Sequence, residues 1–363
     1  MGKPRTIEAV KDDIRSRVGR RAPFLHADRA EAEEALARMQ NFEGEVWASA
    51  WNDLGARWEE QAHTAETAGK AAQAKEAFLL SYGYYGIARH PFPSTPGKHH
   101  GYEKTREMFL AASKYFDIPV ERVLIPFRDK PIVGHLRLPK KLPAPMVMHW
   151  GGIDNWKEER HSFGEAFVKE GWGCFIMDSP GTGECPLLAG PDAHAVHTTA
   201  LEYLSKRPEV DAGKVAVVGA SFGGHWSTKL AHVASDKLRA AVNWGGGIHY
   251  FFQPQWQERS RHADSYLFDL IEARANLFGK KTFDELCAAM PALSLLDQGW
   301  LDKPCAPLLI VNGKEDKQVP LDDFYLLLEH GDPKAIRLFP GGHMGAIPNI
   351  LQTVIAWLHQ KLD

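Results

Sequence analysis

From Asp117 onward the chain alternates between short apolar runs rich in β-forming residues and stretches with helical periodicity. This alternation restricts the fold more than any other feature, because strands that alternate with helices form a mostly parallel sheet with helices on both faces. The sequence therefore predicts an α/β fold. The helical stretches include RHSFGEAFVKEG and GGHWSTKLAHVAS, and the strand-like runs are, in order, VERVLIPF, PIVGHLRLP, APMVMHWGG, GCFIMDSPG, KVAVVGAS, AAVNWGGG, PLLIVNGKED and AIRLFPGG.

Two places depart from the simple alternation. Only Arg128-Asp129-Lys130 separates the first two runs, which is too short for a crossover helix, so these runs are predicted to form an antiparallel hairpin. An aromatic, helix-prone insertion occupies about residues 248–300, just after the sixth run. Open α/β sheets bind ligands at the carboxyl ends of their strands, so we expect the insertion to lie over that edge.

Residues 1–116 have helical periodicity throughout. Asp28 is expected to cap one helix, AAQAKEAFLLSYGYYGIAR is predicted as another that ends before the prolines of HPFPSTPGKHHG, and a further helix is expected around Tyr102 to Tyr115. One helical stripe of large residues is interpreted as helix packing rather than as a ligand site. Its members are Trp47, Trp51, Leu54 and Trp58.

Apolar stripes of this kind must be buried against other apolar surfaces of the protein. We therefore expect residues 1–116 to form a helical N-terminal cap domain and residues 117–363 to form the α/β domain. A chain of 363 residues is long enough for this arrangement.

The composition is that of an ordinary soluble globular protein, and the partner that we expect is a small-molecule substrate. Hydrophobic residues make up 44% and charged residues 25% of the chain, and the net charge of −3 gives no general attraction to nucleic acid or to a membrane. No apolar run reaches the roughly 18 residues of a membrane span, and the N-terminal residues lack the apolar segment of a signal peptide. The four cysteines have no CxxC spacing, so we expect reduced thiols in a cytoplasmic protein.

The stretch VAVVGASFGGHW places Ser221 between glycines, after a predicted strand and before a predicted helix. A serine in a glycine-rich turn is commonly only a turn residue. However, a GxSxG pattern that follows a strand and precedes a helix is typical of a nucleophile elbow, where the serine Oγ is exposed for attack. Serine needs a base to remove its proton, so this interpretation requires partners later in the chain.

His343 is the best candidate for the base, because it lies on the glycine-rich loop FPGGHMGAI after the last predicted strand. Asp316, at the exit of the preceding strand, is the best candidate for the acid that orients it, and Glu315 is the nearest rival. The chain order Ser, Asp, His is the order of an α/β-hydrolase triad. The alternative for each of these residues is a loop side chain without chemistry.

A tetrahedral intermediate needs hydrogen-bond donors for its oxyanion. We expect one donor to be the backbone N–H of Phe222, directly after the nucleophile, and the second to be that of Gly152 or Ile153 in HWGGIDNWKEE. A purely structural turn is the alternative for these glycines.

Other chemistries find little support. MDSPGTGEC has neither GxxxxGK[ST] nor GxGxxG, so phosphate binding is not expected. The chain contains no HExxH motif or Cys/His cluster, so no metal and no cofactor are expected. Several aromatic residues near the predicted pocket suit an apolar carbonyl substrate, although the same residues also suit packing. They are Trp150, Trp244, Tyr250, Phe251, Phe252 and Trp256.

Taken together, the motifs HWGGIDNWKEE, DSPGTGE, GASFGG, NGKED and PGGHMG, with the helical N-terminal extension, resemble the FrsA-like branch of the α/β-hydrolases. Within that branch the chain is similar to 2,6-dihydroxypseudooxynicotine hydrolase and to fungal polyketide-shortening hydrolases of the yellowish-green pigment type. The resemblance implies an α/β-hydrolase fold, a Ser-His-Asp hydrolase, a capping role for the N-terminal part and a homodimer.

The resemblance also implies that some members hydrolyse carbon–carbon bonds of β-diketone-like or acyl-phenol compounds. The resemblance implies that an acidic side chain, just after the strand that leads to the oxyanion hole, assists the cleavage, as a glutamate does in the pseudooxynicotine enzyme. Asp154 matches that position, with a side chain one methylene shorter than glutamate. The alternative is that Asp154 caps a helix that begins near Asn155. The first hypothesis is therefore a serine hydrolase for an apolar or aromatic carbonyl compound, by carbon–carbon, ester or lactone hydrolysis; the second is a non-catalytic binding protein on a hydrolase scaffold.

Overall fold

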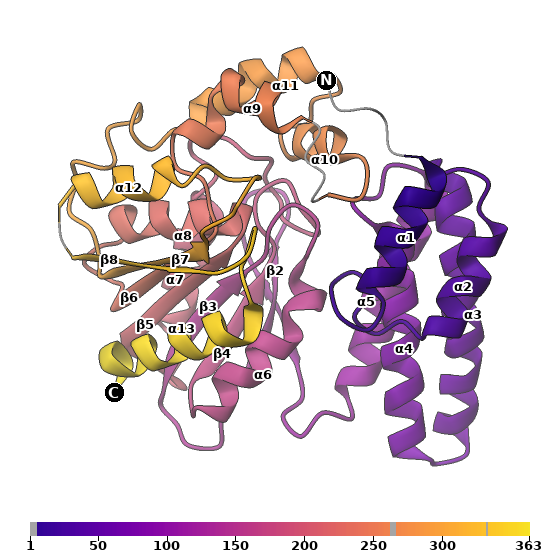
Figure 1. Ribbon diagram of the computed structural model, residues 1–363. Helices are drawn as coiled ribbons and strands as arrows, with labels where there is room; N and C mark the ends of the chain where they lie inside the picture. Colours follow the sequence, from indigo (N-terminus) through magenta and orange to yellow (C-terminus); the bar gives the residue numbers. More distant parts are fainter. Residues whose placement is uncertain (1–5, 262–265, 332) are drawn as a thin grey trace. The chain divides into compact units, whose positions relative to one another are not determined.

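The computed structural model describes residues 6–261, 266–331 and 333–363, which fall into two compact units. The first unit contains the described residues up to Val120 together with Tyr266–Asp269, and the second contains the remainder (Figure 1). The first unit thus ends four residues after the predicted boundary, and it takes in a short piece of the insertion. A capping role for this unit stays a prediction.

The first unit is helical, as its periodicity predicts. Asp28 caps α2, because its carboxylate accepts hydrogen bonds from the backbone N–H groups of Ala30 and Glu31. The last helix begins at Pro96, earlier than predicted; proline is tolerated in the first turn, where its missing N–H has no partner to lose. The helices are α1 (Ile7–Arg17), α2 (Arg29–Arg38), α3 (Gly44–Thr67), α4 (Ala71–Arg89) and α5 (Pro96–Ser113).

The tryptophan stripe of α3 forms the core of the first unit, which confirms the packing interpretation. Trp47 and Trp51 are fully buried, and the Trp47 indole N–H donates a 2.7 Å hydrogen bond to the carbonyl of Ile87 in α4. Phe268, from the insertion, packs against Trp47 with ring centroids 4.8 Å apart. Part of the insertion therefore completes the core of the first unit.

The second unit is built on one sheet of eight strands in the described part of the chain, in the order β1-β2-β4-β3-β5-β6-β7-β8. The first two strands form the predicted antiparallel hairpin, β2 pairs antiparallel with β4, and all later pairs are parallel. The strands are β1 (Glu121–Ile125), β2 (Ile132–Arg137), β3 (Ala144–Trp150), β4 (Gly173–Met177), β5 (Val210–Ala220), β6 (Ala240–Trp244), β7 (Leu308–Gly313) and β8 (Lys334–Phe339).

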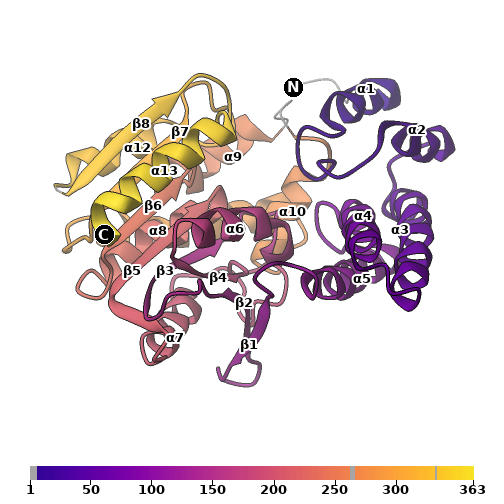
Figure 2. The ribbon, with the colours of Figure 1, turned by 90° about the horizontal axis from the view of Figure 1, so that it is seen from below.

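Helices cover both faces of this sheet (Figures 1 and 2). The helix between β3 and β4 lies on one face, and the helices of the later crossovers lie on the other (Figure 2). This arrangement is expected of right-handed crossovers, because the chain reverses its direction across the sheet after β4. The first face carries η1 (Lys157–Arg160), α6 (His161–Lys169) and α13 (Ile347–Leu362), and the second carries α7 (Ala195–Leu204), α8 (Phe222–Val233) and α12 (Asp322–Glu329).

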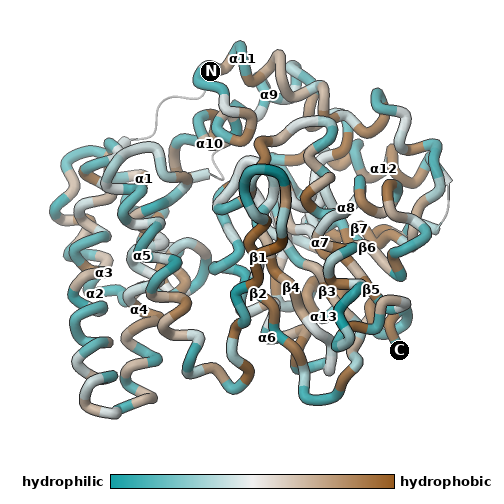
Figure 3. Tube along the Cα trace, turned by 180° about the vertical axis from the view of Figure 1, so that it is seen from behind, coloured by the Kyte–Doolittle hydropathy of each residue, from teal (hydrophilic) through white to brown (hydrophobic). Residues whose placement is uncertain are grey.

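The central strands are buried along their whole length, as expected for strands covered on both sides. Hydrophobic stretches along the sheet are visible as brown segments in Figure 3. All four cysteines are free thiols. None of the helices in the described part of the chain combines the length and hydropathy that a membrane-spanning segment requires.

The insertion between β6 and β7 is helical, as predicted, and Asp323 of α12 holds its first turn. The carboxylate of Asp323 is fully buried and accepts hydrogen bonds of 2.7–3.1 Å from four consecutive backbone N–H groups, Ile248 to Phe251. The elements of the insertion are η2 (Tyr250–Phe252), α9 (Pro254–Ser260), α10 (Leu270–Leu277), α11 (Phe283–Ala289) and η3 (Met290–Leu293).

Candidate active site

Ser221 lies on a sharp turn between β5 and α8, with φ of 55° and ψ of −129°. Its backbone N–H donates a 2.7 Å hydrogen bond to the carbonyl of Trp244, at the end of the neighbouring strand. The flanking glycines are required by close backbone approach: a Cβ at Gly219 would lie 2.0 Å from the carbonyl oxygen of Gly223, and one at Gly223 would lie 2.5 Å from that of Gly151. The GxSxG pattern thus forms a strained turn that presents the serine side chain.

The structure brings Ser221, His343 and Asp316 together in one chain of hydrogen bonds. Ser221 Oγ lies 2.8 Å from His343 Nε2, and His343 Nδ1 lies 2.7 Å from Asp316 Oδ2. Glu315, the rival acid, is exposed, and its backbone N–H donates to the carbonyl of Gly341. Of the two acidic residues in this loop, it is Asp316 that contacts the imidazole.

Asp316 is held from several sides. Its Oδ2 also accepts a 2.7 Å hydrogen bond from the Asn312 side chain, and its Oδ1 accepts bonds of 2.7 Å and 3.1 Å from the backbone N–H groups of Gln318 and Val319. Burial raises the pKa of Asp316, but His343 and these donors outweigh it, so the net shift is downward. The carboxylate therefore stays ionised beside the imidazole.

Two residues that the sequence did not single out for this purpose hold the His343 loop. Asn312, at the end of β7, accepts a 3.1 Å hydrogen bond from the backbone N–H of Met344, and the Trp244 indole N–H donates a 3.0 Å bond to the carbonyl of Met344. Met344 has φ of 68°, which is unfavourable for a residue with a side chain. Because both its backbone groups are bonded, the surrounding structure maintains this conformation. The polar Asn312 inside an otherwise apolar strand was the available sequence signal.

The loop after β3 passes directly beside the nucleophile. A Cβ at Gly152 would lie 2.7 Å from the Cβ of Ser221 and 3.4 Å from the backbone nitrogen of Phe222. Phe222 is the first residue of α8, and the first N–H groups of a helix have no partner within it. Gly152 and the Phe222 N–H therefore lie next to Ser221, and half-buried Ile153 is the next residue of the same loop.

Asp154 lies half-buried in the same loop, and the capping alternative for it is wrong. The helical turn begins at Lys157 rather than near Asn155, and the N–H of its N-cap residue, Trp156, donates to the carboxylate of Glu159 at 2.6 Å. The negative charge of Asp154 also influences the pKa of Arg160. Burial lowers the pKa of that guanidinium to about 10, while Glu159 and Asp154 oppose this shift.

Most of the aromatic residues expected to line the pocket are packed in the core. Trp150 is fully buried, and its indole N–H donates a 2.8 Å hydrogen bond to the carbonyl of Gly223 in the elbow. Trp244 is also fully buried and bonded to the His343 loop, so both tryptophans hold backbone segments of the candidate site instead of offering surface to a ligand. In the insertion, Phe251 and Phe252 are buried and Trp256 is half-buried against the same core, whereas Tyr250 is 42% exposed.

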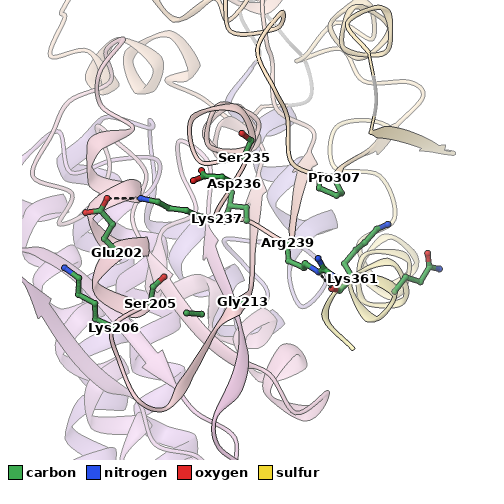
Figure 4. Close-up of a pocket in the computed structure, with 13 residues that line it drawn as sticks. Glu202, Ser205, Lys206, Gly213, Ser235, Asp236, Lys237, Arg239, Pro307 and Lys361 are labelled. Atoms are coloured by element: carbon green, nitrogen blue, oxygen red, sulfur yellow. Dashed lines mark hydrogen bonds and ion pairs between the residues drawn. The ribbon is translucent and has the colours of Figure 1, made fainter.

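A cavity of about 1000 Å³ lies elsewhere, near the beginnings of β5, β6 and β7 (Figure 4). Arg239 and Pro307 in its wall directly precede β6 and β7, and Lys237 and Glu202, which also line the cavity, form a 3.2 Å ion pair. Gly213, also in the wall, is eight residues before Ser221, or roughly 26 Å along a strand. This cavity is therefore separate from the Ser221 site.

Comparisons with known proteins identify the family and the fold of the chain. A profile of the family described as "Esterase FrsA-like" matches residues 7–363. Esterase FrsA of Photobacterium profundum is 25% identical over 344 residues, which cover 91% of this chain and 80% of that protein. The alpha/beta hydrolase gkaG of Penicillium citrinum is 29% identical over 231 residues, 59% of this chain and 54% of that protein.

Among solved structures, the 2,6-dihydroxy-pseudo-oxynicotine hydrolase is similar in fold, with a TM-score of 0.78 and 21% identity over 94% of this chain and 95% of that one. This likeness and the sheet topology confirm the predicted α/β-hydrolase fold. The family match covers almost the whole chain, including the first unit and every residue of the Ser221 site. This protein is an α/β-hydrolase that belongs to the FrsA-like esterase family.

Proposed function

We propose that the protein is a serine hydrolase in which Ser221, His343 and Asp316 act as a catalytic triad on an apolar or aromatic carbonyl compound. The observation that carries this proposal is the 2.8 Å distance between Ser221 Oγ and His343 Nε2, on a serine held at φ of 55°. A serine in an ordinary turn has no need of an aligned imidazole and a buried carboxylate behind it.

The first step is attack on the carbonyl carbon. As Ser221 Oγ forms the new C–O bond, its proton passes to His343 Nε2 and the carbonyl π electrons move onto the oxygen. The oxyanion is stabilised by the backbone N–H of Phe222 and by that of Gly152 or Ile153. Collapse of the intermediate expels the leaving group, which takes the proton from His343, and leaves an acyl-enzyme.

Water then completes the cycle. His343 removes a proton from the water as it attacks the acyl carbon, and returns that proton to Ser221 Oγ as the acid product leaves. Asp316 accepts the hydrogen bond from His343 Nδ1 throughout, which fixes the tautomer and stabilises the imidazolium.

Ester hydrolysis is the reaction that the family description favours, since the matching profile and the bacterial relatives are called esterases. A second candidate is carbon–carbon bond hydrolysis of a β-diketone-like or acyl-phenol compound by the same triad, which is what the resemblance to the fold neighbour named 2,6-dihydroxy-pseudo-oxynicotine hydrolase implies. A carbanion leaving group must be protonated as it departs, and Asp154, in the loop next to Ser221, is the candidate acid for that step.

Labelling with a fluorophosphonate probe tests the proposal directly. We expect covalent labelling of the wild-type protein and none of Ser221→Ala, because the probe forms a bond with an activated serine Oγ. Aryl esters and β-diketones would then be compared as substrates, with product masses measured. If the folded wild-type protein is not labelled and hydrolyses neither class, the non-catalytic binding protein becomes the better description.

A further inference from the structure

We propose that Lys157 and Asp178 together position the oxyanion loop, residues 151–156, against the nucleophile. Neither residue touches the reacting atoms in the proposed function, on which this inference rests. Lys157 belongs to the motif HWGGIDNWKEE and Asp178 to the motif DSPGTGE, and neither of these two residues has a role in the proposed reaction.

Asp178 holds Lys157 at two points. One carboxylate oxygen accepts a 2.8 Å hydrogen bond from the Lys157 backbone N–H, and the other accepts a 2.9 Å bond from its Nζ. Asp178 directly follows β4, which pairs with β3 in parallel, so the carboxylate stands beside the point where the oxyanion loop leaves the sheet. Lys157 is the first residue after that loop, so this contact fixes the end of the loop to the sheet.

The contact is fully buried and strongly charged. The side chains of Lys157 and Asp178 are 0% and 1% exposed, and Lys157 Nζ also lies 2.7 Å from Glu158 and 2.9 Å from Glu184. Three carboxylates thus surround one ammonium group. A buried charge cluster of this kind tolerates little displacement, because any movement separates charges in a medium of low dielectric constant.

The backbone around Asp178 also holds its carboxylate in place. Its Oδ2 also accepts a 2.9 Å bond from the N–H of Glu184, and a Cβ at Gly183 would lie 2.1 Å from that oxygen. Gly183 has φ of 49°, so glycine is suited to this position on both counts. Gly183 thus lets the backbone close around the Asp178 carboxylate.

The beginning of the oxyanion loop is tied to the same strand end. The Ser179 hydroxyl donates a 2.8 Å hydrogen bond to the carbonyl of Gly151, and a Cβ at Gly151 would lie 1.8 Å from the carbonyl oxygen of Asn155. Asp178 and Ser179 therefore hold both ends of a tightly folded loop, and Gly152 lies between them. Because oxyanion donors act through preorganisation, this double attachment controls transition-state stabilisation.

The test compares Lys157→Met with Lys229→Met. Lys229 in α8 is also buried, and it bonds the carbonyl of Pro191 and the side chain of Gln298, away from the oxyanion loop. Both substitutions remove a buried ammonium and both are expected to lower thermal stability. Below the unfolding range, we expect only Lys157→Met to lower kcat, by about 10²-fold, with KM changed by less than threefold, since loss of one oxyanion donor costs about 10²–10³-fold.

Affinity for an aryl trifluoromethyl ketone provides a second measurement, because its tetrahedral adduct places an oxyanion in the same site. It should weaken in parallel with kcat/KM in Lys157→Met and stay unchanged in Lys229→Met. Ser179→Ala removes only the hydrogen bond to the carbonyl of Gly151 and should lower kcat about 3–10-fold. This variant tests the proposal if Lys157→Met does not fold.

Equal kcat in folded Lys157→Met and wild type, unchanged kcat in Ser179→Ala, or equal losses in the two methionine variants would overturn the positioning role. These outcomes are distinguishable from failure of the proposed function, in which the wild-type protein itself would show no probe labelling and no turnover.

Discussion

The indole N–H of Trp244 donates a 3.0 Å hydrogen bond to the carbonyl of Met344, the residue that follows His343. The carbonyl of the same tryptophan accepts the N–H of Ser221 at 2.7 Å. One buried residue at the end of β6 thus holds the backbone next to both the candidate nucleophile and the candidate base.

Trp244→Phe should therefore impair catalysis more than folding. The variant keeps an aromatic ring against Phe163 but leaves the Met344 carbonyl without its donor, at a cost of about 1–2 kcal/mol in unfolding free energy. We expect kcat to fall about tenfold, because the imidazole loses part of its alignment. Steady-state kinetics and urea unfolding check this, with Trp172→Phe, a buried tryptophan that packs on Phe167 and His359, as the control. Equal kinetics in the two variants would contradict the prediction.

Gly152→Ala should lower turnover by about 10²-fold or more. The added methyl group would lie 2.7 Å from the Cβ and 3.0 Å from the Oγ of Ser221, so the oxyanion loop or the serine must move. Gly190→Ala is the control, because a Cβ there meets no atom within 4 Å. An unchanged kcat for Gly152→Ala would remove this glycine from the immediate surroundings of the oxyanion.

Asp323→Asn should destabilise the protein by about 2–4 kcal/mol. Four backbone N–H groups share this buried carboxylate, and an asparagine offers one acceptor oxygen and turns a donor toward the others. Urea unfolding measures the change. Asp322→Asn, on the exposed neighbour in the same helical turn, should stay within about 0.5 kcal/mol of wild type. Similar unfolding free energies for the two variants would contradict the anchoring role.

Mild acid should destabilise the protein, in part through His197. This side chain is fully buried between Trp150 and Trp226, and burial lowers its pKa from 6.5 to about 3. The unfolded chain binds a proton below pH 6.5 whereas the folded one does not, so stability is full above pH 6.5 and falls by about 1.4 kcal/mol per pH unit below it.

His197→Phe removes this titration and keeps a ring in the stack. Urea unfolding between pH 7.5 and pH 5 should therefore give a shallower loss of stability for this variant than for wild type. His99→Phe, at an exposed position, should leave the slope as in wild type. A slope unaffected by His197→Phe would mean that the imidazole is protonated in the folded state.

Asp154→Asn separates the two candidate reactions. If Asp154 protonates a carbanion leaving group, the variant should lose about 10²–10⁴-fold in diketone turnover while activated aryl esters are spared. If Asp154 only balances the charge of Arg160, diketone and ester turnover should change together and by a small factor. Product masses from paired assays on one preparation distinguish the outcomes, and full retention of both activities would remove Asp154 from the mechanism.

The sequence by itself determined the α/β class, the hairpin at the start of the sheet and the helical first unit, and it predicted that Ser221, Asp316 and His343 belong to one candidate site. These features are local or periodic: burial on both faces requires uninterrupted apolar strands, and a nucleophile on a tight turn requires glycines at fixed spacing. The packing of Trp47 and Trp51 could also be inferred, because helical spacing alone puts them on one face.

Only the tertiary structure decided what depends on contacts between distant segments. Phe268 of the insertion packs into the core of the first unit. The indole N–H groups of Trp150 and Trp244 donate to backbone carbonyls rather than facing a ligand. Lys157 lies among three carboxylates. A composition or spacing pattern cannot reveal such roles. Whether a tryptophan or a lysine binds a ligand or holds a backbone segment depends on which buried polar groups the fold brings within hydrogen-bonding distance of it.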